Sequence, residues 1–249
     1  MKALILAAGY ATRLYPLTRN HPKPLLQIGE RTILDHFLSN LSGTAIDAVY
    51  IVTNARFAAD FTAWADAAVH SNRYPDFTIH VINDGTLDNE TRLGAIGDIQ
   101  FVLQKMSVQD DLLISAGDNI YTFAFKDFFS FYARVKSAVI LAHPLHDEER
   151  LKRHGIITVD DSGRVTGFEE KPQHPRSNLV APAFYILHSA ALQLLQRYLD
   201  EGNNPDAPGH FIGWLYTRAP VYAYIMRERY YDIGTLNAYQ EACRMFHKP

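Results

Sequence analysis

The sequence predicts an α/β fold with a mixed, predominantly parallel central sheet. Short runs of branched apolar residues alternate with longer segments of helical period through the first half of the chain, which is typical of crossover units that feed a parallel sheet. The 249 residues are 47% hydrophobic, so the chain can bury one sizeable core. The strands expected in this half are residues 3–7, 48–53, 78–82, 111–115 and 138–143, and the expected helices are residues 32–41, 55–70, 93–106 and 125–135.

The second half of the chain has a different pattern. Residues 155–159 and 164–169 flank a turn sequence at residues 160–163, and this arrangement predicts a β-hairpin that forms a small lobe. There is no internal repeat or long linker, so one compact domain over residues 1–249 is expected. The elements expected beyond the hairpin are a strand at 180–187, a helix at 190–199, a loop at 202–209, a strand at 221–226 and a helix at 236–246.

Composition and charge disfavour several classes of protein. The net charge is −3 and no run of Lys and Arg appears, so the electrostatic signature of a nucleic-acid binder is missing. No stretch approaches the roughly 20 apolar residues that span a bilayer, so we expect no membrane partner. The single cysteine, Cys243, cannot form an internal disulfide and favours a reducing, cytoplasmic location.

The most informative stretch runs from Leu6 to Leu26 and contains Ala-Ala-Gly, Thr-Arg and Pro-Lys-Pro-Leu. A strand that ends in small residues lets a ligand approach the backbone, whose N–H groups can hold phosphate oxygens. Arg13 supplies a planar fork and Lys23 a mobile point charge, and both suit anions. For a lone Gly-x-Ala-x-Arg, an ordinary surface turn with solvated charges is the favoured interpretation.

The whole stretch resembles the N-terminal signature of the sugar nucleotidylyltransferases, L-A-A-G-x-G-T-R-L-x-P-L-T followed by P-K-P-L. The resemblance implies a Rossmann-like three-layer α/β/α fold in which Arg13 and Lys23 are catalytic. Ala11 stands where the family usually has its second glycine, and alanine resists positive φ. The residues implied to bind nucleotide in this stretch are Ala8, Gly9, Thr12 and Arg13.

Two later motifs each place a carboxylate after an apolar strand. Gly117-Asp118-Asn119-Ile120-Tyr121 ends one strand, and such a carboxylate suits a hard divalent cation that also binds phosphate oxygens. The motif looks like that of the glucose-1-phosphate thymidylyltransferase branch. Tyr231-Asp232-Ile233-Gly234-Thr235 resembles the family's W-x-D-I-G-T element, although Asp232 could simply cap the last helix. The resemblance implies that Asp118 and Asp232 hold Mg²⁺ and that Asp118 also binds nucleotide.

The predicted hairpin carries a third motif, Glu169-Glu170-Lys171-Pro172. Taken alone, it would be a solvated strand end. It is similar to the family's acceptor-binding hairpin, which implies that Gly155 and Glu170 meet a sugar and that Lys171 holds its phosphate. On this interpretation residues 1–143 form the nucleotide-binding half of the domain, and residues 144–249 form the acceptor-binding and closing half.

The middle of the chain fits the family less well. Gly94-Ala95 stands where relatives approach the base, so Gly94 is expected to bind nucleotide, but the polar run at residues 83–92 is atypical and an ordinary loop is nearly as well supported. An aromatic cluster at residues 121–132 predicts core packing, with a homo-oligomer contact as the minority interpretation.

The function implied is transfer of a nucleoside monophosphate from a nucleoside triphosphate to a sugar 1-phosphate, which yields an NDP-sugar and pyrophosphate. A cytidylyltransferase that acts on a non-sugar phosphate such as phosphocholine remains an alternative, as does a catalytically inactive nucleotide-binding regulator. A nucleotide-sugar glycosyltransferase is disfavoured because no Asp-x-Asp motif appears. The expected partners are a nucleoside triphosphate and a phosphorylated small-molecule acceptor.

Overall fold

A computed structural model describes residues 1–246, and the chain divides into two compact units made of interleaved segments. Unit 1 consists mainly of Leu93–Ser115 and Lys126–Arg227. Unit 2 consists of Lys2–Arg92, Ala116–Phe125 and the segment that begins at Glu228. The single functional domain expected from the sequence stays a prediction.

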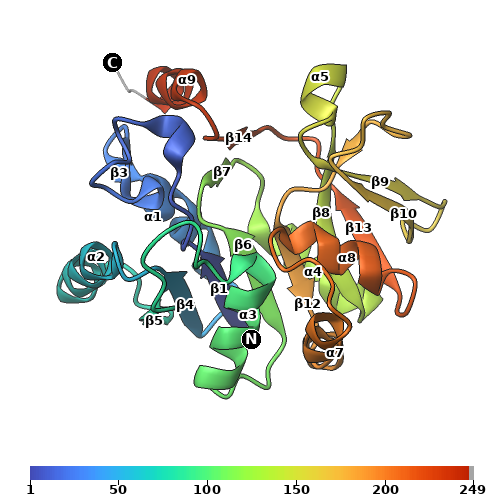
Figure 1. Ribbon diagram of the computed structural model, residues 1–249, viewed down its shortest axis with the longest axis horizontal. Helices are drawn as coiled ribbons and strands as arrows, with labels where there is room; N and C mark the ends of the chain where they lie inside the picture. The colour runs from blue at the N-terminus through green and yellow to red at the C-terminus, as the bar shows by residue number, and fades with distance from the viewer. Residues whose placement is uncertain (247–249) are drawn as a thin grey trace. The chain divides into compact units, whose positions relative to one another are not determined.

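The sheet of unit 2 is parallel. β1 (Lys2–Leu6) pairs with β4 (Ala48–Thr53), which pairs with β5 (Thr78–Asn83), and α2 (Ala58–His70) packs against β5 (Figure 1). β4 is the middle strand of the three, and every one of its residues is buried, which requires both faces of the sheet to be covered. The carboxyl ends of these strands therefore meet at one edge, where ligands bind in folds of this type.

Shorter elements complete unit 2. α1 (Ile33–Leu38) begins with a capping box, in which the Thr32 hydroxyl accepts from the Asp35 N–H at 3.0 Å and the Asp35 carboxylate accepts from the Thr32 N–H at 3.1 Å. The strands β2 (Gln27–Ile28) and β3 (Arg31–Thr32) pair, as do β7 (Asn119–Tyr121) and β14 (Tyr230–Asp232). α9 (Leu236–Phe246) packs against β2 and β14.

Unit 1 contains a mostly antiparallel sheet. Its strand order is β10 (Val165–Glu170), β9 (Gly155–Val159), β11 (Leu179–Val180), β8 (Ala138–Pro144), β12 (Phe184–Leu187) and β6 (Leu112–Ala116). β13 (Val221–Ile225) runs parallel to β8. With the parallel strands of unit 2, these strands confirm the predicted α/β class with a mixed sheet.

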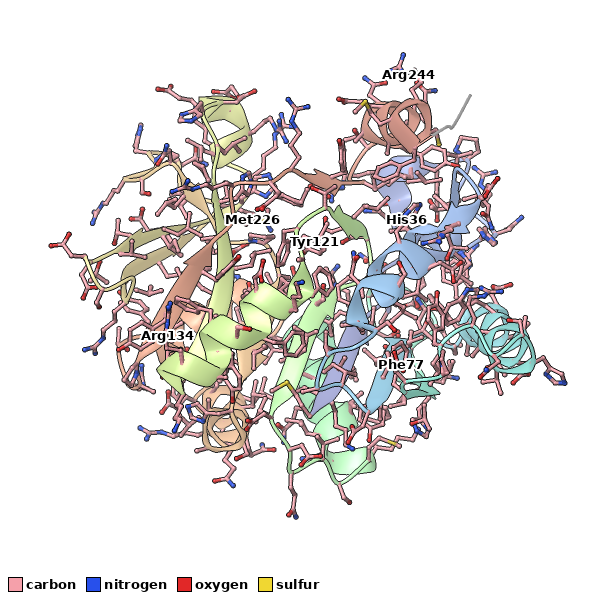
Figure 2. The ribbon with its side chains drawn as sticks, turned by 180° about the vertical axis from the view of Figure 1, so that it is seen from behind. His36, Phe77, Tyr121, Arg134, Met226 and Arg244 are labelled. Atoms are coloured by element: carbon pink, nitrogen blue, oxygen red, sulfur yellow. The ribbon has the colours of Figure 1, made fainter. Side chains whose placement is uncertain are left out.

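Helices cover both faces of the unit 1 sheet. Figure 1 shows α8 (Pro208–Leu215) and α7 (Leu194–Asp200) in front of it, and Figure 2, seen from the opposite side, shows α4 (Phe125–Val135) in front, with Arg134 labelled. Phe128 of α4 packs edge-on against Phe184 of β12 at 4.9 Å between ring centroids. The remaining helices of this unit are α3 (Gly94–Lys105), α5 (Glu148–Leu151) and α6 (Ser189–Leu192).

Two expectations about the second half were wrong. The strand expected over residues 180–187 is two strands, β11 and β12, which pair at different places and are separated around Pro182, whose nitrogen cannot donate to a ladder. The loop expected at residues 202–209 ends early, because Pro208 opens α8 as a favourable first helical residue.

The aromatic cluster is core, as predicted. In unit 2, Tyr121 (labelled in Figure 2) and Phe123 are buried, and Phe125 stacks edge-on against Phe37 at 5.2 Å. The minority interpretation of this cluster, a homo-oligomer contact, stays a prediction. None of the helices between residues 1 and 246 combines the length and apolar character that crossing a bilayer requires.

Candidate functional site

A cavity of about 280 Å³ lies in unit 2 at the end of β1. It contains the predicted Arg13, Lys23 and Asp118. Its lining residues are Leu6, Ala7, Gly9, Tyr10, Ala11, Thr12, Arg13, Leu14, Lys23, Pro24, Asn89, Arg92, Ala116 and Asp118. Residues separated by more than a hundred positions in the chain therefore meet at one strand end.

The loop after β1 has open space at Gly9, and a hydrogen bond from Asn54 fixes its backbone at Ala8. Gly9 is exposed, and a β-carbon added to it would meet no atom within 4 Å. The carbonyl of Ala8 accepts a hydrogen bond from Asn54 at 2.9 Å, which fixes the neighbouring backbone. Thr12, Arg13 and Leu14 form the short helix η1 (Thr12–Leu14), with Thr12 and Arg13 exposed. The loop therefore offers backbone and a guanidinium to a ligand.

Ala11 adopts the left-handed conformation that glycine normally takes, with φ 46° and ψ 40°. Its carbonyl accepts hydrogen bonds from the Leu14 N–H at 3.0 Å and from the Thr18 hydroxyl at 2.8 Å. These two bonds hold the loop in a shape that costs an alanine about 1 kcal/mol. Ala11 therefore holds the left-handed conformation that usually requires a glycine.

Replacing Ala11 with glycine should therefore not weaken the fold. Ala11→Gly removes the left-handed strain but adds freedom to the unfolded chain, so we expect a change in the free energy of unfolding between zero and a gain of about 1 kcal/mol. Urea denaturation measures it. The control is Ala65→Gly, a buried position inside α2, which should lose about 1 kcal/mol or more. If Ala11→Gly lowered the free energy of unfolding by as much as Ala65→Gly, the backbone of Ala11 would not be strained.

Lys23 and Asp118 form a close ion pair. The Lys23 Nζ lies 2.7 Å from the Asp118 Oδ2, and the Lys23 side chain is only 6% exposed, against 36% for Asp118. Lys23 belongs to the short helix η2 (Lys23–Leu25), between Pro22 and Pro24, which restricts its backbone. The pair gives the buried Lys23 side chain a partner of opposite charge and leaves part of the Asp118 carboxylate open to the cavity.

Gly117 allows this approach. A β-carbon there would lie 3.3 Å from the Pro24 side chain and 3.0 Å from the Ile5 side chain. The Gly117 N–H also donates to the Leu6 carbonyl at 3.0 Å. A larger residue at this position would push the Ile5 and Pro24 side chains away by a few tenths of an ångström.

Of the two predicted metal ligands, Asp232 lies in β14, and Asp118 lies in the turn that precedes its partner strand β7. Asp232 of β14 is opposite Asn119 of β7 in the ladder, and the Ile233 N–H donates to the Asp118 carbonyl at 3.3 Å. The Asp232 carboxylate lies over Gly234, where a β-carbon would be 3.2 Å from Oδ1. The backbone segments that carry the two carboxylates, distant in sequence, thus lie side by side, although Asp232 is not among the residues that line the cavity.

This donor set fits Mg²⁺. The ion prefers hard oxygen ligands and usually binds through one or two carboxylates together with water and substrate phosphates. Between residues 1 and 246 no group of three or more His, Cys, Asp or Glu could hold a metal, so a complete cage of protein ligands is not built there. Asp118 and Asp232 could hold an ion that a nucleotide also ligates.

Gly94 is held by the fold of unit 1. Its φ is 78°, and a β-carbon there would lie 2.5 Å from the Pro205 carbonyl oxygen. The following N–H groups of Ala95 and Ile96 donate to the carbonyls of Asp206 and Pro205 at 3.0 and 2.9 Å. The positive φ and the closeness of Pro205 explain why a glycine stands at position 94. Its expected role in nucleotide binding stays a prediction.

The hairpin of unit 1 brings Gly155 and Glu170 together. They are directly paired in the β9–β10 ladder, and a β-carbon on Gly155 would lie 3.1 Å from the Glu170 Oε2. A β-carbon on Gly209 in α8 would also meet this oxygen. Burial, followed by the negative charge of Glu170, raises the pKa of Tyr185. The carboxylate therefore lies between two glycines and near a buried tyrosine.

Sequence reasoning missed Gly209, because it fell in a segment expected to be loop. The ring of Phe168 is also held there, with its Cζ 2.9 Å from a β-carbon built on Gly209. The one available signal was the Pro208-Gly209 pair at a helix start.

Lys171 has a strained backbone, with φ 49°. Its N–H donates to the His154 carbonyl at 3.1 Å, and its Nζ lies 3.6 Å from the Glu170 Oε1. Its side chain is nonetheless more than half exposed. Such strain persists where the surroundings fix it, often at functional sites.

Basic groups gather around this lysine. Burial, and then the positive charges of Arg150, His143, Lys171 and Arg153, lower the pKa of His154 to about 4. These residues come from the end of β8, the α5 turn and the end of β10. The cluster makes the neighbourhood of Lys171 attractive to an anion.

His154 should make the protein acid-sensitive. Its folded pKa of about 4 lies below the usual 6.5, so the unfolded chain binds the proton more readily, and stability is lost as pH falls from 6.5 towards 4. After screening, the loss is no more than about 2 kcal/mol. Urea denaturation between pH 7 and 4 should show a shallower decline for His154→Gln than for wild type. As a control, His174→Gln, at an exposed position, should lose stability with falling pH as wild type does. If the unfolding free energies of wild type and both variants fell in parallel, His154 would not be the cause of the acid sensitivity.

Comparison with known proteins identifies the family of the chain. The chain belongs to the nucleotidyl transferase family, whose sequence pattern matches residues 2–248. Glucose-1-phosphate adenylyltransferases of Desulfitobacterium hafniense (strain Y51) and Bacillus subtilis (strain 168) are each 28% identical to it over 96% of its length. The aligned region covers 62% and 65% of those proteins, so the chain spans about three fifths of the curated relatives it matches.

Solved structures share the fold. A UDP-glucose pyrophosphorylase complexed with UDP-glucose has a TM-score of 0.82 at 19% identity, with 98% of this chain and 97% of that one covered. A Bacillus anthracis protein described as a glucose-1-phosphate thymidylyltransferase, in complex with sucrose, has a TM-score of 0.79 at 21% identity, with 100% and 96% covered. The predicted Rossmann-like fold is confirmed, and so is the membership of a nucleotidyl transferase family.

Proposed function

We propose that this chain transfers a nucleoside monophosphate from a nucleoside triphosphate to a sugar 1-phosphate, with release of pyrophosphate. The observation that carries the proposal is the cavity of unit 2, where Arg13, Lys23 and Asp118 meet at a strand end. Family membership and relatives named for sugar phosphates support the same reaction.

The reaction needs positioning and charge neutralisation rather than a protein nucleophile. An oxygen of the acceptor phosphate forms a bond to the α-phosphorus, the bond from that phosphorus to the bridging oxygen breaks, and its electron pair leaves with pyrophosphate. Arg13 neutralises charge that develops on the phosphates, and Lys23 offsets repulsion between the two anionic substrates. The small-residue loop binds phosphate oxygens through its N–H groups.

Asp118 and Asp232 would hold Mg²⁺ in this scheme. The ion, when bound, polarises the phosphate oxygens it contacts. Asp118 is already close to Lys23, so the carboxylate orients the lysine whether or not it binds a metal.

Unit 1 supplies the acceptor side. Glu170, held between Gly155 and Gly209, accepts hydrogen bonds from sugar hydroxyls, and a carboxylate fixed in this way discriminates strongly among polyols. Lys171 and its basic neighbours hold the acceptor phosphate. This second charged site favours a working enzyme over an inactive nucleotide-binding regulator.

One assay tests the proposal. Each nucleoside triphosphate is incubated with glucose 1-phosphate, mannose 1-phosphate or phosphocholine in the presence of Mg²⁺, and pyrophosphate release is measured. We expect release with at least one sugar 1-phosphate and its loss on adding excess chelator. Pyrophosphate release with phosphocholine alone would show that the acceptor is not a sugar 1-phosphate. No release with any combination of nucleoside triphosphate and acceptor would overturn the proposal.

A further inference from the structure

Unit 2 contains an apolar cluster whose members stand next to the charged residues of the candidate site. Its buried members are Leu14, Leu26, Ile28, Ile33, Ile120, Ile233 and Ala242, and the half-buried side chains of Tyr231, Tyr239, Cys243 and Phe246 pack against them. Leu14 also lines the cavity. These residues come from five separate stretches of the chain, so the cluster joins segments that the sequence keeps far apart.

The cluster holds the two segments that carry the cations. Leu14 directly follows Arg13 in η1 and is only 1% exposed. The Leu26 N–H donates to the Lys23 carbonyl at 3.0 Å, which ties the end of η2 to the cluster. The backbones of Arg13 and Lys23 are therefore anchored by buried apolar neighbours.

The same cluster holds the two segments that carry the carboxylates. Ile233 directly follows Asp232, is fully buried, and donates its N–H to the Asp118 carbonyl at 3.3 Å. Ile120, two residues after Asp118, is buried as well. Each of the four predicted charged residues thus lies within three positions of a buried member of one cluster.

The helix α9 closes this cluster. Its Ala242 is fully buried, the Tyr239 hydroxyl donates to the Gln27 carbonyl at 2.8 Å, and the Phe246 ring packs edge-on against Tyr231 at 5.5 Å between centroids. The helix packs against β2 and β14 (Figure 1). The described residues of α9 are not among those that line the cavity, so the helix touches the site through the cluster.

We propose that Leu14 and Ile233 are positioning residues for the charged site and that α9 keeps them in place. This proposal rests on the proposed function. Protein interiors are close-packed and transmit strain, so a void or an excess of volume in the cluster displaces the neighbouring backbone. Misplacing a group by about 1 Å can lower a rate about a hundredfold, even when the changed residue lies far from the chemistry.

The first test truncates Leu14. Leu14→Ala should lower kcat about tenfold or more, and Leu14→Met, which has a similar volume, should recover most of that loss. The control is Leu41→Ala in the short helix η3 (Ser39–Leu41), a fully buried leucine of unit 2 outside the cluster. It should change kcat by no more than about twofold once the rate is divided by the fraction of folded protein.

The second test acts from α9. Ala242→Leu should lower kcat about tenfold, whereas Ala68→Leu, which overpacks a similarly buried alanine of α2, should not. The KM for the acceptor should stay near wild type in Ala242→Leu, because Gly155 and Glu170 belong to unit 1. If Ala242→Leu does not fold, Ala242→Val adds less volume and takes its place.

Binding of inorganic pyrophosphate, measured by calorimetry, gives a readout that does not depend on turnover. Ala242→Leu should weaken it and Ala68→Leu should not, because only the former displaces Arg13 and Lys23. Equal kcat and equal pyrophosphate affinity in these two variants, or wild-type kcat in Leu14→Ala, would overturn the proposal. If wild type turns over no substrate pair, the proposed function fails and pyrophosphate binding decides on the cluster. A wild type that neither turns over nor binds pyrophosphate overturns both.

Discussion

Asp118→Asn should lower turnover by about a hundredfold or more while the protein stays folded. The substitution keeps the shape of the side chain but removes the charge that faces both Lys23 and the cavity. Loss of one such electrostatic contact at a reacting phosphate typically costs this much. The measurement is kcat at saturating substrates and Mg²⁺, together with the free energy of unfolding.

The stability effect is separable from the catalytic one. Asp118→Asn leaves the buried Lys23 ammonium without its carboxylate, so we expect a loss of about 1–3 kcal/mol in unfolding free energy. Adding Lys23→Met should restore stability but not turnover. The matched control is Asp47→Asn, which breaks the surface pair between Lys2 and Asp47, also 2.7 Å long, and should change neither property by much. Near-wild-type turnover in Asp118→Asn would remove this residue from the catalytic machinery.

Gly209→Ala should raise the KM for the acceptor about tenfold or more and leave the KM for the triphosphate near wild type. The added methyl group would meet the Glu170 carboxylate and come within 2.9 Å of the Phe168 ring, so both must move. The substitution itself favours the helix, which keeps the protein folded. Steady-state kinetics with each substrate varied in turn gives the two KM values.

The matched control lies one turn further along α8. Gly213→Ala would place its methyl group 3.1 Å from Phe168, and the three nearest atoms all belong to that side chain. It should disturb Phe168 mildly and spare Glu170. Equal effects of the two substitutions on the acceptor KM would show that the position of the Phe168 ring, rather than the Glu170 carboxylate, controls acceptor binding.

The sequence predicted elements that carry a strong local pattern. β4 reads as a continuous apolar run because it is buried on both faces, and the loop after β1 is marked by its small residues. The ion pair between Lys23 and Asp118 was not predicted, because nothing local links residues that are 95 positions apart. β7 and β14 have three residues each, too few to show a period, and they exist through their mutual pairing.

Other features depended on contacts that a sequence does not display. The left-handed conformation of Ala11 opposes the preference of alanine and is held by Thr18, seven residues away. Gly209 matters because a strand brings Glu170 against it.

The interleaving of the two units fixes an order of assembly during synthesis. A ribosome releases the chain from its N-terminus, so residues 93–227, which complete unit 1 apart from Met1, emerge before the segment that starts at Glu228. β14 belongs to that last segment, and β7 has no partner strand until it arrives. The loop after β1 is thus translated before unit 1, yet β14 and Asp232, which belong to the same unit as that loop, follow only after residues 93–227.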